Sequence, residues 1–316
     1  VGKTQEEIET AVKLGILFFN VESTQELESI NYIAKNLKCI PQVAIRINPD
    51  IEPKTHSYIT TGRLTNKFGI DFKTAYKILL KQKDYPYLRI RGLHIHIGSQ
   101  ITDKAPYISA ISKMVNFIRK LKKRRINLEY LNIGGGLGIV YDKEKPQTAE
   151  EFAQQILPLL RNTELKLIME PGRFIIGNAG ILITKVLYIK KSSKKTFVIV
   201  DAGMNDLIRP ALYEAYHRIV PLNLNHKKRI IADVVGPICE SADFFAKERK
   251  IPKVKEGDYL AIMGAGAYGF SMSSNYNSRL RSAEVLVKAN KFYLIRERED
   301  YKDLIDKERI PDFIKR

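Results

Sequence analysis

Short apolar runs alternate with amphipathic stretches over residues 1–175. Five of the runs predict strands, at residues 17–21, 42–48, 88–97, 128–133 and 166–169. Five stretches with apolar residues at helical spacing predict helices, at residues 6–14, 24–37, 72–82, 107–122 and 149–160. This alternation is typical of parallel strands joined by crossover helices, so we expect an α/β domain over residues 1–175.

The pattern changes to β from about residue 176. Apolar runs with turn residues between them predict strands at residues 180–188, 196–200, 230–235, 259–263 and 283–288. We therefore expect a second, β-rich domain of sandwich or barrel type over residues 176–316, with a short helix in its charged tail. The first domain has too few units to close an eight-stranded barrel, but a barrel that lacks its first units would give this pattern.

Composition adds limits to this picture. The 316 residues are enough for one large domain or two of ordinary size. There is no apolar run long enough to span a membrane and no charged-then-apolar leader, so we expect no membrane span, no export signal and a cytoplasmic location. Cys39 and Cys239 lie far apart without metal-type spacing, and we expect neither a structural disulfide nor zinc.

The formal net charge of +18, taken alone, would favour a nucleic-acid partner. The densest basic run, residues 119–125, ends a stretch whose apolar positions recur at helical spacing. Its cations then lie on a solvated helix face near the helix C-terminus, where the helix dipole favours them. No aromatic residues interleave with this run, so we expect no nucleic-acid partner.

Residues that can carry chemistry follow three successive predicted strands. They lie at residues 94–100, 134–138 and 170–173. The C-terminal ends of parallel strands meet at one edge of a sheet, where α/β enzymes collect their active-site residues. We therefore expect these three segments to lie together.

Three consecutive glycines, Gly134, Gly135 and Gly136, follow the fourth strand. Such a turn lets backbone N–H groups approach an anion closely, which suits a phosphate. Ser99 can add a hydroxyl donor to the same anion. The alternative is a turn that only relieves close packing.

His94 and His96 alternate along the third strand and so point to the same face. No third residue of metal-ligand type lies nearby in the sequence, so we expect no metal. His96 can instead stack on a planar ring, although a core histidine with satisfied hydrogen bonds is the alternative.

Glu170 at a strand end is costly to bury unless a cation pairs with it, and a protonated ring nitrogen would serve. Arg173 follows across a Pro-Gly turn and offers a planar fork for a phosphate or a carboxylate. Its alternative partner is Glu170 itself. Arg209, with Tyr213 nearby, offers a second carboxylate fork.

Cys239 and Glu240 lie side by side on a turn that begins at Gly236 and Pro237. The turn follows an apolar run, so the thiol can sit at a strand end and face a cleft as a reactive group. The alternative is a buried small hydrophobe, which is the commonest role of a free cysteine.

Residues 264–269 match the glycine pattern of a dinucleotide-binding turn and follow a predicted strand. The next residues, 270–277, are poor helix starters. Because that turn must lead from a strand into a helix, we reject dinucleotide binding.

Together these motifs closely resemble the diaminopimelate decarboxylase family, in the alanine-racemase-like group of pyridoxal-phosphate (PLP) enzymes that also contains ornithine and arginine decarboxylases. The matching segments are residues 56–62, 67–70, 94–100, 134–136, 170–173, 209–213, 236–241 and 264–277. The resemblance covers nearly the whole chain. It implies a (β/α)8 barrel followed by a β domain, and PLP-dependent decarboxylation of meso-2,6-diaminopimelate to L-lysine with release of carbon dioxide.

The resemblance also implies roles for individual residues. The cofactor-binding residues are His96, Ser99, Gly134, Gly135, Gly136, Glu170, Pro171, Gly172, Arg173 and Tyr268. Of these, His96 stacks on the cofactor ring and Glu170 pairs with the pyridine nitrogen, which keeps the ring an electron sink. The substrate-binding residues are Arg173, Arg209, Tyr213, Glu240 and Tyr268. Cys239 donates a proton, reaching the site from the partner subunit of a homodimer.

One family feature is absent. The Schiff-base lysine of the family lies in a Tyr-Ala-x-Lys-Ala-Asn-like motif on the first barrel strand, and the sequence contains no such motif. Lys3 is not its equivalent, so we expect the first barrel units to be missing from this sequence. Two alternatives stay open: a sister PLP decarboxylase that acts on arginine, ornithine or a polyamine precursor, and a truncated, inactive remnant.

Overall fold

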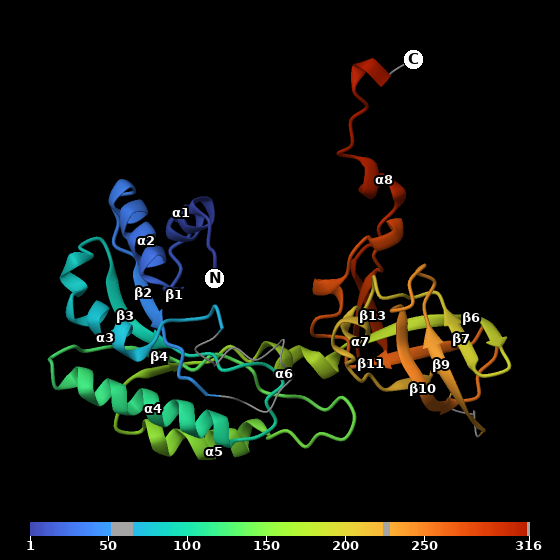
Figure 1. The fold of residues 1–316 in the computed structure, drawn as a ribbon, viewed down its shortest axis with the longest axis horizontal. Helices are drawn as coiled ribbons and strands as arrows, with labels where there is room; N and C mark the ends of the chain where they lie inside the picture. Colours follow the sequence, from blue (N-terminus) through green and yellow to red (C-terminus); the bar gives the residue numbers. More distant parts are fainter. Residues whose placement is uncertain (52–65, 224–227, 315–316) are drawn as a thin grey trace. The chain divides into compact units, whose positions relative to one another are not determined.

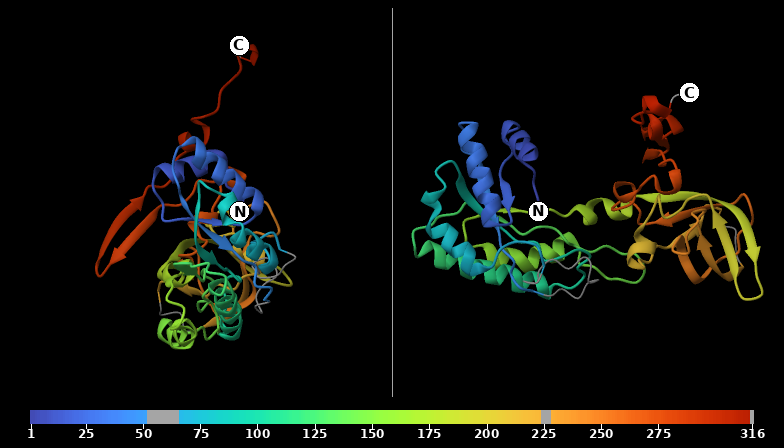
Figure 2. Two further views of the ribbon diagram at one scale, coloured as in Figure 1. Left: turned by 90° about the vertical axis from the view of Figure 1, so that its left-hand side faces the viewer. Right: turned by 45° about the horizontal axis from the view of Figure 1, so that its top comes forward.

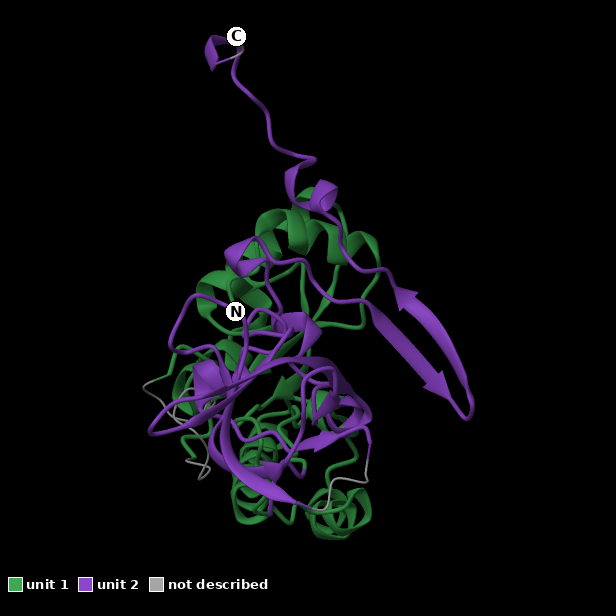
Figure 3. Ribbon diagram, turned by 90° about the vertical axis from the view of Figure 1, so that its right-hand side faces the viewer, with its two compact units in different colours: residues 1–139, 144–174 green, residues 140–143, 175–316 purple. Residues whose placement is uncertain are grey.

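The computed structural model describes residues 1–51, 66–223 and 228–314 (Figure 1). The chain divides into two compact units (Figure 3). Unit 1 comprises Val1–Ile139 and Glu144–Phe174, and unit 2 comprises Val140–Lys143 and Ile175–Arg316. Each unit has its own cluster of buried apolar side chains.

Unit 1 contains a five-stranded sheet in which all neighbouring strands are parallel. The strands are β1 (Phe19–Val21), β2 (Gln42–Arg46), β3 (Arg89–His94), β4 (Tyr130–Asn132) and β5 (Lys166–Ile168). Their order in space is their order along the chain, which is the arrangement found in the wall of a β/α barrel. The expected α/β class is confirmed, although each strand is shorter than the apolar run that predicted it.

The helices of unit 1 lie within two residues of the expected bounds. They are α1 (Gln5–Lys13), α2 (Thr24–Asn36), α3 (Phe72–Leu80), α4 (Ala105–Lys122) and α5 (Ala149–Leu160). Their ends are marked by side-chain caps: Thr4 and Thr148 each form a reciprocal capping box, at α1 and α5. Helices α4 and α5 pack side by side (Figure 1). The basic residues within 119–125 are all exposed, as expected of a solvated face, and Leu121 between them is buried.

Unit 2 is built on a six-stranded sheet of order β10-β9-β7-β6-β11-β8. Its strands are β6 (Ile181–Lys191), β7 (Thr196–Val200), β8 (Ile219–Pro221), β9 (Arg229–Val235), β10 (Phe244–Pro252) and β11 (Tyr259–Met263). All neighbours are antiparallel except β7 and β9. A separate hairpin of β12 (Glu284–Lys288) and β13 (Lys291–Arg296) projects from this sheet within unit 2 (Figure 2).

The remaining helical segments are short. They are α6 (Gly172–Ile176), α7 (Arg209–Tyr213), α8 (Tyr301–Ile305) and the 3-10 turns Gln82–Asp84, Gly177–Ala179, Phe270–Met272, Tyr276–Ser278 and Asp312–Ile314. Helix α8 is the short helix expected in the charged tail. Among the described residues, none of the helices is both long and apolar enough to cross a membrane.

Three strands of unit 2, β8, β10 and β13, were not predicted from the sequence. Strand β10 begins with apolar residues but continues through Lys247, Glu248 and Arg249, and two register shifts interrupt its pairing with β9. It lies at the end of the strand order, where charged side chains can reach water. An edge strand of this kind loses the regular alternation on which the sequence prediction depends.

Candidate active site

The strands of unit 1 run parallel, so their C-terminal ends form one edge of the sheet, here called the carboxyl edge. Polar residues at or just after the five strand ends collect there. In strand order they are Glu22, Arg46, His94, Asn132 and Glu170. The three segments that the sequence predicted to converge, 94–100, 134–138 and 170–173, also lie at this edge and contact one another.

Glu170 follows β5, and its side chain is 45% exposed. Asn132 Nδ2 donates to Glu170 Oε1 at 2.7 Å, and Asn20 Nδ2 approaches the same oxygen at 3.4 Å. His94 Nε2 lies 3.7 Å from it, which is too long for a hydrogen bond. The carboxylate is therefore held from one side by amide groups and remains open to a ligand on the other.

The glycine turn (Gly134, Gly135 and Gly136) is needed for both conformation and space. Gly134 and Gly136 have φ values of +68° and +98°, which disfavour side chains. A Cβ atom on Gly135 would collide with the carbonyl oxygen of Glu170. The turn is thus packed tightly against the strand end that carries the carboxylate.

Two N–H groups of the glycine turn already have acceptors within unit 1. The Gly134 N–H donates to Asn132 Oδ1 at 2.9 Å, and the Gly135 N–H donates to His96 Nδ1 at 3.1 Å. The Gly136 N–H has no hydrogen-bond acceptor among the residues that the structure describes. Of the three glycine N–H groups, only that of Gly136 has no acceptor among the described residues and can therefore donate to an anion.

His96 is partly buried and neutral at ordinary pH. Burial and the charge of Arg46 lower its pKa to about 4, against smaller opposing effects of Glu170 and Glu22. His94 is more deeply buried, and burial together with Arg46 holds its pKa well below its usual range. Both imidazoles are therefore uncharged in the folded protein.

Ser99 and Arg173 lie together beside the glycine turn. Arg173 donates to Ser99 Oγ from NH2 at 2.9 Å and from Nε at 3.3 Å, and its side chain is buried. Gly98, next to Ser99, contacts Gly136 closely. A buried guanidinium, a hydroxyl and an N–H group thus share one small region. Pro171 and Gly172 join Glu170 to Arg173 and begin α6.

Arg46 and Glu22 form a buried ion pair at the ends of β1 and β2. Arg46 NH1 donates to Glu22 Oε1 at 2.7 Å, and the Gly69 N–H donates to Glu22 Oε2 at 3.0 Å. Although burial raises the pKa of Glu22, Arg46 and the Gly69 N–H hold it below its usual range. The matching segment 67–70 therefore lies at the carboxyl edge, whereas residues 56–62 are outside the described residues.

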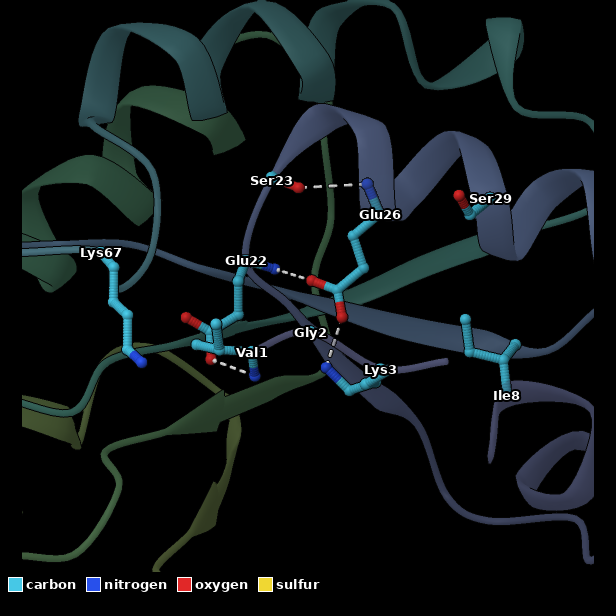
Figure 4. Close-up of a pocket in the computed structure, with 9 residues that line it drawn as sticks. All are labelled: Val1, Gly2, Lys3, Ile8, Glu22, Ser23, Glu26, Ser29 and Lys67. Atoms are coloured by element: carbon cyan, nitrogen blue, oxygen red, sulfur yellow. Dashed lines mark hydrogen bonds and ion pairs between the residues drawn. The ribbon is translucent and has the colours of Figure 1, made fainter. Parts of the chain in front are cut away.

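A pocket opens beside this ion pair (Figure 4). Its lining residues are Val1, Gly2, Lys3, Ile8, Glu22, Ser23, Glu26, Ser29 and Lys67. Lys3 Nζ donates to Glu26 Oε1 and to the Asn20 carbonyl oxygen, as the close-up shows for Glu26. The amine of Lys3 is thus engaged in an ion pair with Glu26.

In unit 2, Arg209 is buried at the start of α7. Its NH1 donates to His217 Nε2 at 2.9 Å, and its guanidinium carbon lies 4.4 Å from the ring centroid of Tyr141. His217 Nδ1 faces the Met263 carbonyl oxygen at 2.8 Å, so that nitrogen must carry the proton. Arg209 is therefore fixed on two sides. Tyr213 ends the same helix and is partly buried.

Cys239 is exposed, so its interpretation as a buried hydrophobe is wrong. The turn that carries it is organised by Asp243, whose carboxylate accepts the N–H groups of Ile238 at 2.7 Å and Met204 at 2.6 Å. Burial raises the pKa of Asp243 despite these hydrogen bonds. Next to Cys239, the Glu240 carboxylate accepts the Tyr276 hydroxyl at 2.6 Å, which raises the pKa of Tyr276.

Tyr268 lies on the glycine-rich segment after β11, and 41% of it is exposed. Its φ of +58° is rare for a tyrosine and costs backbone strain. The segment leads into the 3-10 turn Phe270–Met272 and not into an α-helix. The strand–turn–helix context of a dinucleotide site is therefore absent, as the sequence indicated.

Four residues with structural roles at these places were not predicted from the sequence: Asn20, Asn132, His217 and Asp243. Asn132 could have been found, because it ends a strand two residues before the first glycine of the turn. His217 and Asp243 each join a nearby partner, Arg209 or Ile238, to a distant one, Met263 or Met204, and the distant contacts could not be predicted from the sequence.

The carboxyl edge fits a phosphorylated aromatic cofactor. The Gly136 N–H, Ser99 and the buried Arg173 suit a phosphate, and the glycine turn leaves no room for side chains. His96 presents a neutral ring, and Glu170 presents an open carboxylate to a basic ring nitrogen. Among the described residues, no group of three or more His, Cys, Asp or Glu is placed to hold a metal ion.

Comparison with known proteins gives the same assignment. The family profile "Pyridoxal-dependent decarboxylase, pyridoxal binding domain" matches residues 1–177. Diaminopimelate decarboxylase of Aquifex aeolicus is 50% identical over 313 residues, which are 97% of this chain and 73% of that protein.

Solved structures agree in fold as well as in sequence. Diaminopimelate decarboxylase from Helicobacter pylori, complexed with L-lysine, has a TM-score of 0.93 and 45% identity over 97% of this chain and 76% of that chain. Diaminopimelate decarboxylase from M. jannaschi has a TM-score of 0.92 and 42% identity over 99% of this chain and 74% of that chain. PLP is the cofactor of this family. The chain belongs to the diaminopimelate decarboxylase family of pyridoxal-dependent decarboxylases.

Proposed function

We propose that the protein decarboxylates meso-2,6-diaminopimelate to L-lysine, with the residues of the carboxyl edge holding PLP. The observation that carries this proposal is the cluster of Glu170, His96, the glycine turn and Arg173 on one edge of a sheet. The L-lysine bound to the Helicobacter pylori relative supports the assignment of the product.

In the reaction, the bond between the α-carbon and its carboxylate breaks, carbon dioxide leaves, and a proton is added to the same carbon. When bound, PLP supplies a ring that accepts the electron pair of the broken bond. Glu170 favours the protonated form of the pyridine nitrogen, because a carboxylate stabilises a cation beside it. His96 stacks on the ring as a neutral imidazole and so adds no charge that opposes this protonation.

At the other end of the cofactor site, Ser99, Arg173 and the Gly136 N–H bind the phosphate. The guanidinium supplies the charge-assisted hydrogen bonds that a phosphate favours. Gly134 and Gly135 shape this part of the site rather than donating to the phosphate, because their N–H groups bond to Asn132 and His96. We assign Pro171, Gly172 and Tyr268 to the same cofactor site.

Substrate recognition falls to Arg173, Arg209, Tyr213, Glu240 and Tyr268. Diaminopimelate has a second carboxylate and a second ammonium group, so arginines and a glutamate are chemically complementary to it.

Cys239 delivers the proton to the α-carbon, and its exposure in unit 2 supports access to a reacting atom. We assign it to a site shared between the two subunits of a homodimer. A cytoplasmic location is part of this proposal, since a free, exposed thiol suits a reducing compartment.

The test is substrate selection by the purified, PLP-loaded protein. Carbon dioxide release and lysine formation are measured with meso-diaminopimelate, ornithine and arginine as separate substrates. Lysine from diaminopimelate, with little release from the other two, is the expected result. Preferential turnover of ornithine or arginine would favour the sister decarboxylase instead. Absence of turnover of every substrate by folded, cofactor-bound protein would favour the truncated, inactive remnant that lacks the Schiff-base lysine.

A further inference from the structure

Asn132 connects the two ends of the proposed cofactor site. It is the last residue of β4, the strand between β3 and β5, and only 2% of it is exposed. We propose that Asn132 is a positioning residue that fixes the Glu170 carboxylate relative to the glycine turn. This inference rests on the proposed roles of Glu170 and of the glycine turn in holding PLP.

The contacts of Asn132 use both halves of its amide group. Its Oδ1 accepts the Gly134 N–H at 2.9 Å, and its Nδ2 donates to Glu170 Oε1 at 2.7 Å. A backbone N–H can only donate, so the atom that faces Gly134 is the amide oxygen. The amide NH2 then necessarily faces Glu170, and the orientation of the side chain is determined.

Gly134 and Glu170 are also joined through their backbones. The Glu170 N–H donates to the Gly134 carbonyl oxygen at 2.8 Å. The C=O of Gly134 thus accepts the Glu170 N–H, and the N–H of Gly134 donates to Asn132 Oδ1. Asn132 Nδ2 in turn donates to the Glu170 side chain. This closed set of three hydrogen bonds links the carboxylate to the turn through one buried amide.

Other groups near the carboxylate hold it less firmly. Asn20 Nδ2 is 3.4 Å from Glu170 Oε1, and His94 Nε2 is 3.7 Å away. His94 is neutral, and neither of its ring nitrogens has a hydrogen-bond partner among the described residues. The short bond from Asn132 is thus the contact that fixes this oxygen.

Side chains of similar size cannot replace both contacts. Leucine has neither a donor nor an acceptor. Aspartate keeps an acceptor for the Gly134 N–H but, when ionised, presents a negative oxygen to Glu170 in place of a donor. Asn132→Leu therefore removes both hydrogen bonds, whereas Asn132→Asp removes only the one to Glu170. Comparing the two variants separates these effects.

The experiment measures the Kd for PLP by absorbance titration of the apoenzyme, the Kd for inorganic phosphate by its competition with PLP, and kcat of the holoenzyme. Asn132→Leu should raise the Kd for PLP by roughly 10-fold or more, the effect of losing a charge-assisted hydrogen bond. Asn132→Asp should lower kcat by a similar factor while leaving the Kd for inorganic phosphate near that of the unmodified protein.

A matched control is available in Asn31, whose Oδ1 also accepts a backbone N–H, that of Tyr87, at 3.1 Å. Asn31 lies on α2, outside the cofactor cluster, so Asn31→Leu should leave both the Kd for PLP and kcat unchanged. If Asn132→Leu does not fold, Asn132→Asp still tests the link to Glu170.

A double-mutant cycle with Glu170→Gln identifies which proposal fails. If Asn132 acts through Glu170, the effects on kcat of Asn132→Asp and Glu170→Gln should be strongly non-additive. If Glu170→Gln impairs kcat and PLP binding but both Asn132 variants match the unmodified protein, the positioning role is refuted alone. If Glu170→Gln itself has no effect, the proposed function of Glu170 is refuted, and with it this inference.

Discussion

His96 Nδ1 accepts the backbone N–H of Gly135 at 3.1 Å, so the imidazole and the glycine turn are fixed to one another. A ring nitrogen that accepts a hydrogen bond carries no proton. Burial and the charge of Arg46 lower the pKa of His96 to about 4, which keeps this nitrogen unprotonated at neutral pH. The contact between the segment after β3, which carries His96, and the turn after β4 is therefore sensitive to acid.

The first prediction is a loss of stability in acid through His96. An unfolded histidine titrates near pH 6.5 and folded His96 near pH 4, so between these values only the unfolded chain binds this proton. The free energy of unfolding should therefore fall as the pH drops from 6.5 to 4, by roughly 3 kcal/mol from this group. Urea unfolding at pH 7 and pH 4 should show a smaller loss for His96→Asn than for the unmodified protein. Equal losses would contradict the pKa assigned to His96.

The strands that surround the site were predictable because each lies within a largely apolar run of the sequence. Strand β4, Tyr130–Asn132, is buried at every residue, and it lies within the mostly apolar run of residues 128–133. Strand β10 has the opposite character, since Lys247 and Glu248 are exposed and no period-2 pattern survives its register shifts. Sequence patterning therefore recovers the sheet of unit 1 better than the edges of the sheet of unit 2.

The site was predictable at the level of segments but not of contacts. Parallel strands bring their C-terminal ends to one edge whatever the side chains do, so the convergence of residues 94–100, 134–138 and 170–173 follows from topology. The partner of Arg173 depends on rotamers and distances: the sequence indicated a ligand anion, with Glu170 as the alternative partner, and in the structure Arg173 donates to Ser99. Likewise, a run of glycines does not predict that the Gly134 and Gly135 N–H groups donate to Asn132 and His96.

The second prediction concerns Arg209. Removing its guanidinium should weaken diaminopimelate use far more than use of lysine-sized amino acids, because only diaminopimelate has a distal carboxylate for it. A charge-assisted contact is worth ~1.5 to 3 kcal/mol, or roughly one to two decades in kcat/KM. Steady-state kinetics of Arg209→Ala with both substrate types would measure the change in kcat/KM. An equal loss for both would contradict the assignment of Arg209 to the distal carboxylate.

Stability provides a check on the same variant. Arg209→Ala also removes the hydrogen bond to the buried His217 Nε2, at a cost of ~1 to 3 kcal/mol in the free energy of unfolding. The exposed Arg218 is the matched control. Arg218→Ala should change neither stability nor substrate preference.

The third prediction uses the exposure of Cys239. Since its side chain is not packed, Cys239→Ala should change the free energy of unfolding by less than about 0.5 kcal/mol. If the thiol delivers the proton to the α-carbon, kcat should nevertheless fall by roughly 100-fold or more, the usual contribution of a positioned proton donor. Denaturant unfolding and turnover are measured on the same preparation.

Cys39 is the matched control, because it is the only other cysteine of the chain. It is partly buried against the core of unit 1, and its thiol lies 3.7 Å from the Ala34 carbonyl oxygen. Cys39→Ala should therefore lower stability and leave kcat unchanged. The reverse pattern in the two variants would reject Cys239 as the donor.

The last prediction tests whether the site is shared between subunits. If the Cys239 of one subunit serves the cofactor held by Glu170 of the other, a heterodimer of Cys239→Ala and Glu170→Gln subunits contains one site with both residues intact and one site that lacks both. Random assortment of equal amounts makes about half of the dimers mixed, so roughly a quarter of the unmodified activity should return. The measurement is turnover after the two inactive proteins are unfolded and refolded together, with each refolded alone as the control. If each site were instead built from one subunit, every site would carry one defect and no activity would return. Absence of recovery in heterodimers verified by affinity tags would therefore reject a composite site, while leaving Cys239 as a donor within its own subunit.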